Sequence, residues 1–357
     1  MLKHRSVHVG AGAARGPAGL LALVGTLVFS VSLATASAQG APASVAGIVY
    51  TANEHGKSVS AVDLATGTTT TVDLRIAPHN VQASADGRLL LVTGPPAGAG
   101  HGHGTGEARG RLLVLDAGAL AAGPIADIEV SRHPAHVVVD AAGRLAFVTN
   151  AEDATVSVVD LARGEVVKAI ATGAYPHGLR LGPDGRELYV ANVKAGSVSV
   201  IDTVALAEVA QIPVGEAPVQ VSFTPDGGRV FVSLRDEDSV AVIDTGTRRV
   251  VGKIAVGRGP IQVYATPDGR EVYVANEGSR ENPDDQVTVV DVGRGEVVTT
   301  VVTGKGAHGV VVSPDGSRAF VTNIRDATVS VIDTATREVV ATYAVGAGPN
   351  GITYGAN

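Results

Sequence analysis

Residues 175–214 read YPHGLRLGPDGRELYVANVKAGSVSVIDTVALAEVAQIPV, and this stretch contains the pattern that decides the fold. Its alternation of apolar and polar residues predicts four short strands, and the turn Pro183-Asp184-Gly185 separates the first two. The third strand ends in Val-Ile-Asp. This tripeptide or a near copy of it occurs seven times, ending at Asp63, Asp116, Asp160, Asp202, Asp244, Asp291 and Asp333.

The spacing of these seven aspartates indicates a repeat architecture. Successive aspartates are 53, 44, 42, 42, 47 and 42 residues apart, so the unit has 42 residues and two copies carry insertions. One unit of four short strands cannot bury its own apolar faces, and a period of about 40–45 residues is typical of propeller blades. Seven copies therefore predict seven blades.

The two ends of the chain supply complementary parts of one unit. Residues 47–53 match a second strand with no first strand before it, and residues 348–354 match a first strand with no second after it. Pairing the two would remove the exposed sheet edges that an open array leaves. The sequence thus predicts an all-β, seven-bladed β-propeller of four-stranded antiparallel blades, closed by its N- and C-terminal strands and forming a single domain over residues 46–357.

The first 38 residues have the features of a secretory signal peptide. A basic segment with Lys3, Arg5 and Arg15 precedes the apolar run 19–33, and Ala36-Ser37-Ala38 forms a small-residue cleavage motif. Residues 39–45 then form a short linker. No second long apolar run follows, so we expect a periplasmic or secreted protein without membrane insertion.

Composition excludes several classes of function. Of the 28 Lys and Arg residues three lie in the leader, so the remaining chain has a net charge of −10 against its 35 acidic residues. Nucleic acid is therefore not an expected partner, because phosphate backbones require a positive surface. The chain has no cysteine and no tryptophan, which excludes disulfides, thiolate chemistry and tryptophan-lined docking of quinone cofactors.

Four tetrapeptides at the end of the second strand carry a family resemblance: 147–150 (FVTN), 189–192 (YVAN), 273–276 (YVAN) and 320–323 (FVTN). Each is followed by a strand of the V-x-V-(I/V)-D type. The chain therefore resembles the YVTN-repeat seven-bladed β-propeller family over nearly its whole length after the leader. Similar propellers include YncE-like periplasmic proteins, lactonase-like enzymes and haem d1 domains, so the resemblance implies a fold and leaves the activity open.

Residues present in every blade are expected to be structural. The seven aspartates stand before turns, where a carboxylate caps its own backbone. The asparagines that follow the second strand are expected to form turns as well; they are Asn53, Asn150, Asn192, Asn276 and Asn323.

The histidines are not repeated in every blade, which makes them candidates for function. His79, His136, His177 and His308 stand at the start of innermost strands, where Gln220, Gln262 and Asn350 occupy the other blades. Imidazoles around a channel mouth can bind Zn, Cu, Fe or Mn. A water cluster or a small anion would suit the same polar ring. The insertion 94–110 adds His101 and His103, which can also bind a metal or form only a polar loop.

Three hypotheses about function follow. We favour a monomeric, exported binding module whose histidine-rich face binds a small ligand, namely a transition metal or a metal-bearing cofactor. The second hypothesis is a metal-dependent, lactonase-like hydrolase or lyase at the same site, and the sequence leaves enzymatic activity uncertain. The third is a protein-interaction scaffold that meets another protein of the cell envelope.

Overall fold

The structure is a computed structural model that describes residues 46–98 and 108–355. The predicted signal peptide and linker lie outside the described residues. The propeller belongs to one compact unit, Ala43–Asn357. No helix in the described ranges has the length and apolar character needed to cross a bilayer.

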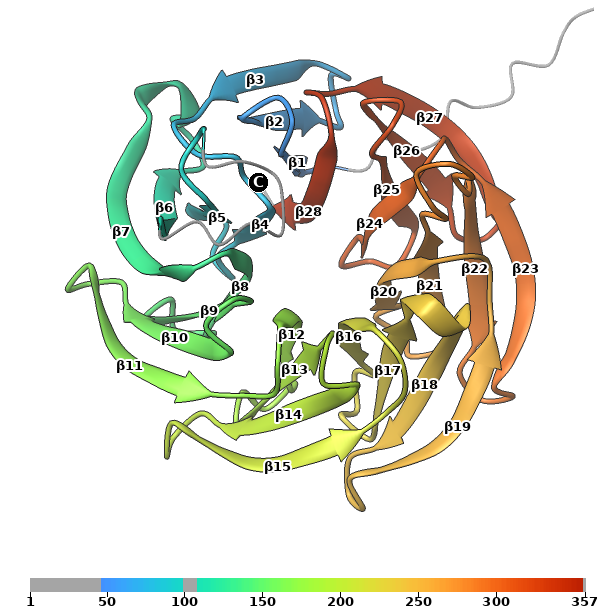
Figure 1. Cartoon of the computed structure of the whole chain (residues 1–357). Helices are drawn as coiled ribbons and strands as arrows, with labels where there is room; N and C mark the ends of the chain where they lie inside the picture. Colours follow the sequence, from blue (N-terminus) through green and yellow to red (C-terminus); the bar gives the residue numbers. More distant parts are fainter. Residues whose placement is uncertain (1–45, 99–107, 356–357) are drawn as a thin grey trace, which may run out of the picture. The chain divides into compact units, whose positions relative to one another are not determined.

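Seven four-stranded antiparallel sheets form a ring, and the central space that their innermost strands enclose is called the channel below (Figure 1). From the channel outwards, the first four blades are β28 (Pro349–Gly355), β1 (Ile48–Asn53), β2 (Ser58–Asp63) and β3 (Thr69–Asp73); β4 (Asn80–Ala83), β5 (Leu89–Gly94), β6 (Arg109–Asp116) and β7 (Pro124–Arg132); β8 (Pro134–Val139), β9 (Leu145–Asn150), β10 (Thr155–Asp160) and β11 (Glu165–Ala171); and β12 (Pro176–Leu181), β13 (Glu187–Asn192), β14 (Ser197–Asp202) and β15 (Ala207–Pro213).

The remaining three blades are β16 (Pro218–Phe223), β17 (Arg229–Leu234), β18 (Ser239–Asp244) and β19 (Arg249–Ala255); β20 (Pro260–Ala265), β21 (Glu271–Asn276), β22 (Gln286–Asp291) and β23 (Glu296–Val302); and β24 (Ala307–Val312), β25 (Arg318–Asn323), β26 (Thr328–Asp333) and β27 (Glu338–Ala344). Two single-turn 3-10 helices, η1 (Leu120–Ala122) and η2 (Arg235–Glu237), interrupt the described strands. The predicted all-β, seven-bladed fold is confirmed.

The ring closes where the two ends of the chain pair. Strand β28 lies antiparallel to β1, with Ile48 opposite Gly355 and Thr51 opposite Ile352. The C-terminal strand therefore becomes the innermost strand of the blade that the N-terminal strand begins, as predicted. Each innermost strand then contacts an innermost strand on either side, so the channel wall is continuous.

The hydrophobic core lies between neighbouring blades. In the described part of the chain it divides into seven clusters, and each cluster combines residues of two adjacent blades. Strands β9, β13, β21 and β25 are buried on both faces, which explains apolar runs such as Leu188–Ala191. One cluster packs Val49 and Ile352, from opposite ends of the chain, against Phe320 of the last blade.

The repeated aspartates cap turns, as the sequence predicts. The Asp63 carboxylate accepts hydrogen bonds from the backbone N–H groups of Ala65 and Thr66, both at 2.9 Å. Asp202 does the same for Val204 and Ala205 at 2.8 Å. The Pro-Asp-Gly turns at the other end of the blades place glycine at positive φ, for example 69° at Gly185, where a side chain would be strained.

The repeated asparagines have a role that differs from the expected one. Each is fully or almost fully buried, and its side-chain amide donates across to the third strand of the blade. In the closing blade the Asn53 amide reaches Ser58 Oγ at 3.1 Å and Ser60 Oγ at 2.9 Å. These asparagines therefore connect two strands inside the blade, because a buried amide donor needs partners that solvent cannot supply.

Shortening Ile352 tests the closing cluster. Ile352→Ala should lower the free energy of unfolding by about 2–5 kcal/mol, because it removes buried methyl groups and leaves a cavity between the first and last blades. The same substitution at Ile125, which is 62% exposed on outer strand β7, should change it by less than about 0.5 kcal/mol. Urea denaturation of both variants gives the two values, and equal effects would contradict the packing described.

Candidate functional site

The first residues of the innermost strands form a polar ring at one end of the channel. His79 directly precedes β4, His136 lies in β8 and His177 lies in β12. The other members are Gln220 of β16, Gln262 of β20, His308 of β24 and Asn350 of β28. Consecutive members of the ring are about one blade apart in the sequence. The innermost strands line the channel side by side, so these distant residues are brought together there.

Three of the four candidate histidines converge. One ring nitrogen from each of His79, His136 and His177 falls within 4.8 Å of the other two, and this is the group of potential metal ligands found among the described residues. His79 Nε2 lies 3.1 Å from His177 Nε2. The ring centroids of His136 and His177 are 4.8 Å apart. The three residues lie at the starts of β4, β8 and β12, which are consecutive in the ring.

His308 does not join this three-histidine cluster. Strand β28 separates its strand from β4, and its imidazole is engaged elsewhere. Nδ1 is 2.9 Å from the Asn350 carbonyl, and Nε2 is 3.7 Å from a carboxylate oxygen of Glu277. His101 and His103 lie outside the described residues.

Hydrogen-bond partners fix the tautomers of two cluster histidines. His177 Nδ1 faces the Val219 carbonyl at 3.2 Å and must donate to it, so its Nε2 presents a lone pair to the cluster. His79 Nε2 then donates to that lone pair. His79 Nδ1 accepts from the Asn350 amide at 3.2 Å, and this amide also donates to Glu54 at 2.5 Å.

His136 has an unsatisfied nitrogen. Its Nδ1 accepts from the Gln220 amide at 3.3 Å, which places the proton on Nε2. The residue is 1% exposed, and Nε2 has no hydrogen-bond partner among the described residues. An unpaired buried polar group costs about 1–3 kcal/mol, so native proteins keep few of them without a functional reason.

The surroundings keep His136 and His177 neutral. Burial lowers the pKa of His136 well below 6.5, and the neighbouring His177 and His79 lower it further. Burial and then His79 lower the pKa of His177 well below 6.5 in the same way. Burial also lowers the pKa of His308, although Glu277 opposes this shift. Neutral imidazole is the form that binds metal ions.

Two carboxylates beside the ring were not singled out as site residues by the sequence. Glu54 Oε2 lies 3.3 Å from His79 Nδ1, and Glu277 approaches His308. A signal for both exists in the repeat, because each directly follows a repeated asparagine, Asn53 or Asn276. A residue that directly follows one of these asparagines lies beside the channel mouth. From sequence alone, such an acidic residue is interpreted as a solvated loop charge.

The fold and the histidine cluster together define a seven-bladed propeller with a nitrogen-rich site at one channel mouth. The family described as "Cytochrome D1 heme domain" matches residues 49–261 and 231–350, and the chain belongs to this family. Its resemblance to YVTN-type propellers is thereby supported. A comparison with curated proteins finds no match.

Solved structures share the fold. A structure titled hydrazine synthase from Kuenenia stuttgartiensis has 23% identity and a TM-score of 0.66, with 80% of this chain and 91% of that one covered. A protein of unknown function from Desulfotomaculum acetoxidans has 15% identity and a TM-score of 0.70, with 87% of this chain and 99% of that one covered. A putative 6-phosphogluconolactonase from Bacteroides uniformis also has 15% identity and a TM-score of 0.70, with 86% of this chain and 99% of that one covered.

The buried histidines should make stability depend on pH. Below pH 6.5 the unfolded chain protonates them while the folded chain keeps His136 and His177 neutral, so stability is complete above this pH and falls as the pH decreases. His136→Gln should reduce the slope of unfolding free energy against pH by about 1.4 kcal/mol per pH unit. Urea denaturation between about pH 5 and 7.5 measures the slope, and an unchanged slope would contradict neutral burial.

Proposed function

We propose that the protein is an exported binding protein that holds a transition-metal ion, or the metal of a metal-bearing cofactor, at His79, His136 and His177. The observation that carries the proposal is the buried Nε2 of His136, which lacks a partner in the described part of the chain and lies beside two further imidazoles. A metal ion bound at that nitrogen would replace the missing interaction. The heme-domain family of the chain supports the same class of ligand.

The spacing of the nitrogens fits one ion. Metal–nitrogen bonds of about 2.0–2.1 Å in a tetrahedral site place two ligand nitrogens about 3.4 Å apart. The distance of 3.1 Å between His79 Nε2 and His177 Nε2 is close to this value, and the third nitrogen lies within 4.8 Å. Small side-chain rotations would bring all three to one centre, and a fourth position would stay open for an exogenous ligand.

The groups behind the histidines support this assignment. When Nε2 binds a metal, the proton moves to Nδ1 and needs an acceptor there. For His177 the Val219 carbonyl already accepts it, and for His79 the Glu54 carboxylate is 3.3 Å away. For His136 the Gln220 amide would have to turn so that its oxygen faces Nδ1. His177 therefore has its metal-binding tautomer before metal binds, whereas His79 and His136 would move a proton from Nε2 to Nδ1.

The donor set favours borderline metals. Three neutral imidazoles suit Zn, Cu, Fe and Ni ions better than Mg or Ca ions, which prefer oxygen ligands. A heme iron could instead be held by one of the three histidines, which would leave the other two as polar neighbours of the site. The proposal therefore includes two ligands, a free metal ion and a heme, and separate titrations with metal salts and with hemin distinguish them.

A binding experiment tests the cluster directly. Purified protein lacking residues 1–38 should bind about one equivalent of Zn²⁺ or Cu²⁺ in calorimetry, or hemin with a change in its absorption spectrum. The double variant His136→Ala/His177→Ala should lose this binding, because it removes two of three ligands. The control His55→Ala changes an exposed histidine outside the cluster and should bind normally. Equal binding by both variants would refute the site.

The role of Glu54 provides a finer test. Glu54→Gln should weaken metal affinity about 10–100-fold, because it removes the carboxylate that accepts the His79 Nδ1 proton. Glu216→Gln makes the same change at an exposed position on the link between β15 and β16 and should leave affinity unchanged. Calorimetric titration of both variants measures the difference. A Glu54→Gln protein with wild-type affinity would show that the carboxylate does not orient the ligand.

A further inference from the structure

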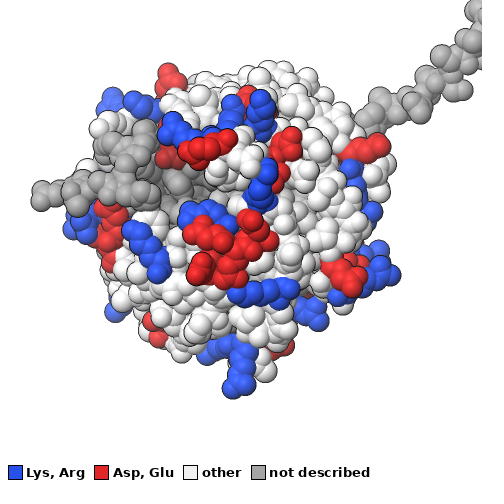
Figure 2. Space-filling model, turned by 45° about the vertical axis from the view of Figure 1, so that its right-hand side comes forward, with Lys and Arg blue, Asp and Glu red and all other residues white. Residues whose placement is uncertain are grey.

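The arginines on the propeller surface are mostly paired with carboxylates. Arg111 lies 2.6 Å from Asp127, and Arg318 lies 2.7 Å from Asp333. On the face shown in Figure 2, Lys and Arg side chains lie among Asp and Glu side chains. An exposed pair such as Arg111–Asp127 contributes little to stability, but each pair shows where the counterion of its arginine lies.

Arg180 differs from these arginines. It is half-buried near the C-terminal end of β12, and none of the described carboxylates forms an ion pair with it. Its guanidinium makes one hydrogen bond, to the neighbouring Leu179 carbonyl at 3.3 Å. Guanidinium has five N–H donors, so most of them have no acceptor within residues 46–98 and 108–355. Burial lowers the pKa of Arg180, yet the group stays charged because an arginine is not deprotonated in proteins.

The guanidinium faces a cavity of about 400 Å³. The cavity lies between later residues of the innermost strands, such as Gln82 and Val138, and its rim includes Pro267 and Pro314 of two Pro-Asp-Gly turns. Those turns lie at the opposite ends of the innermost strands from the histidines. Gln82 follows His79 by three residues, which is roughly 10 Å along an extended strand. The cavity is therefore a site separate from the three-histidine cluster.

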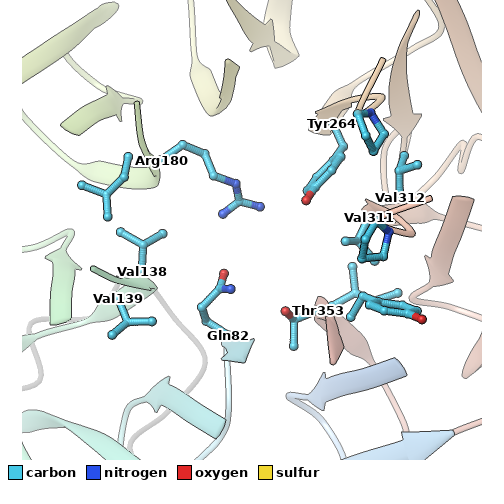
Figure 3. A pocket seen from close by; sticks show the side chains of 13 residues that line it. Gln82, Val138, Val139, Arg180, Tyr264, Val311, Val312 and Thr353 are labelled. Carbon is cyan, nitrogen blue, oxygen red and sulfur yellow. The ribbon is translucent and has the colours of Figure 1, made fainter. Parts of the chain in front are cut away.

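Polar groups converge in the middle of this cavity. Figure 3 shows the Arg180 guanidinium, the Tyr264 hydroxyl and the Gln82 amide directed toward the same space from different strands. The Arg180 guanidinium carbon is 5.8 Å from the centre of the Tyr264 ring. The walls are aliphatic, with Val139 and Val312 among them.

We propose that this cavity binds a small organic carboxylate with an aliphatic body. The Arg180 fork matches the two oxygens of a carboxylate and would supply the charge-assisted hydrogen bonds. The Tyr264 hydroxyl can donate to the same anion, and the valine-lined walls would cover the apolar part. A volume of about 400 Å³ lies within the range of small-molecule sites. Inorganic phosphate would leave the aliphatic walls without contacts.

Calorimetry with hexanoate tests the proposal. Hexanoate should bind with one-to-one stoichiometry, and each methylene removed on the way to acetate should weaken binding about fourfold. Arg180→Gln should reduce hexanoate affinity at least tenfold, while Arg180→Lys should keep part of it. Arg186→Gln is the matched control, because Arg186 is an exposed arginine in the adjoining turn. Tyr264→Phe, which keeps the ring, should weaken binding less than Arg180→Gln.

Several outcomes would overturn the proposal. Hexanol binding as tightly as hexanoate would show that the charge is not recognised, and phosphate binding as tightly would show that the aliphatic walls are not used. Absence of hexanoate binding at millimolar concentration would also refute it. The double variant His136→Ala/His177→Ala should retain hexanoate binding, so failure of metal binding and failure of carboxylate binding are separate results.

Discussion

The antiparallel pairing of β28 with β1 is the interaction on which the rest of the structure depends. It closes the ring, so that every blade packs against two others and β1 has a paired strand on its inner side. The same strand also completes the site. Asn350 of β28 donates to both His79 and Glu54, and its carbonyl faces His308. The strand that closes the ring thus also orients His79.

Ring geometry also explains why one channel can contain two chemically different sites. The innermost strands run along the channel wall, so residues at their starts meet at one end and residues near their ends meet at the other. One end has neutral imidazoles with a carboxylate behind His79, which suits a cation. The other has the unpaired guanidinium of Arg180 above aliphatic walls, which suits an organic anion. Burial acts at both ends by making an unpaired polar group costly.

The sequence was sufficient to predict the fold because each blade is encoded locally. Period, strand alternation and turn residues agree in every unit, and the capping role of residues such as Asp63 follows from local backbone geometry. It also identified the histidines, since they interrupt the repeat. It misjudged the asparagines, because a turn-former and a buried donor such as Asn53 have the same sequence signature.

By itself the sequence determined the number of blades, the closing strand and the end of the channel at which histidines gather, because these depend on repeat register. Only the tertiary structure decided that His79, His136 and His177 converge while His308 turns to another partner. It alone showed that no described carboxylate pairs with Arg180. Such properties depend on distances between blades and on rotamers chosen during packing, and spacing along one chain does not specify either.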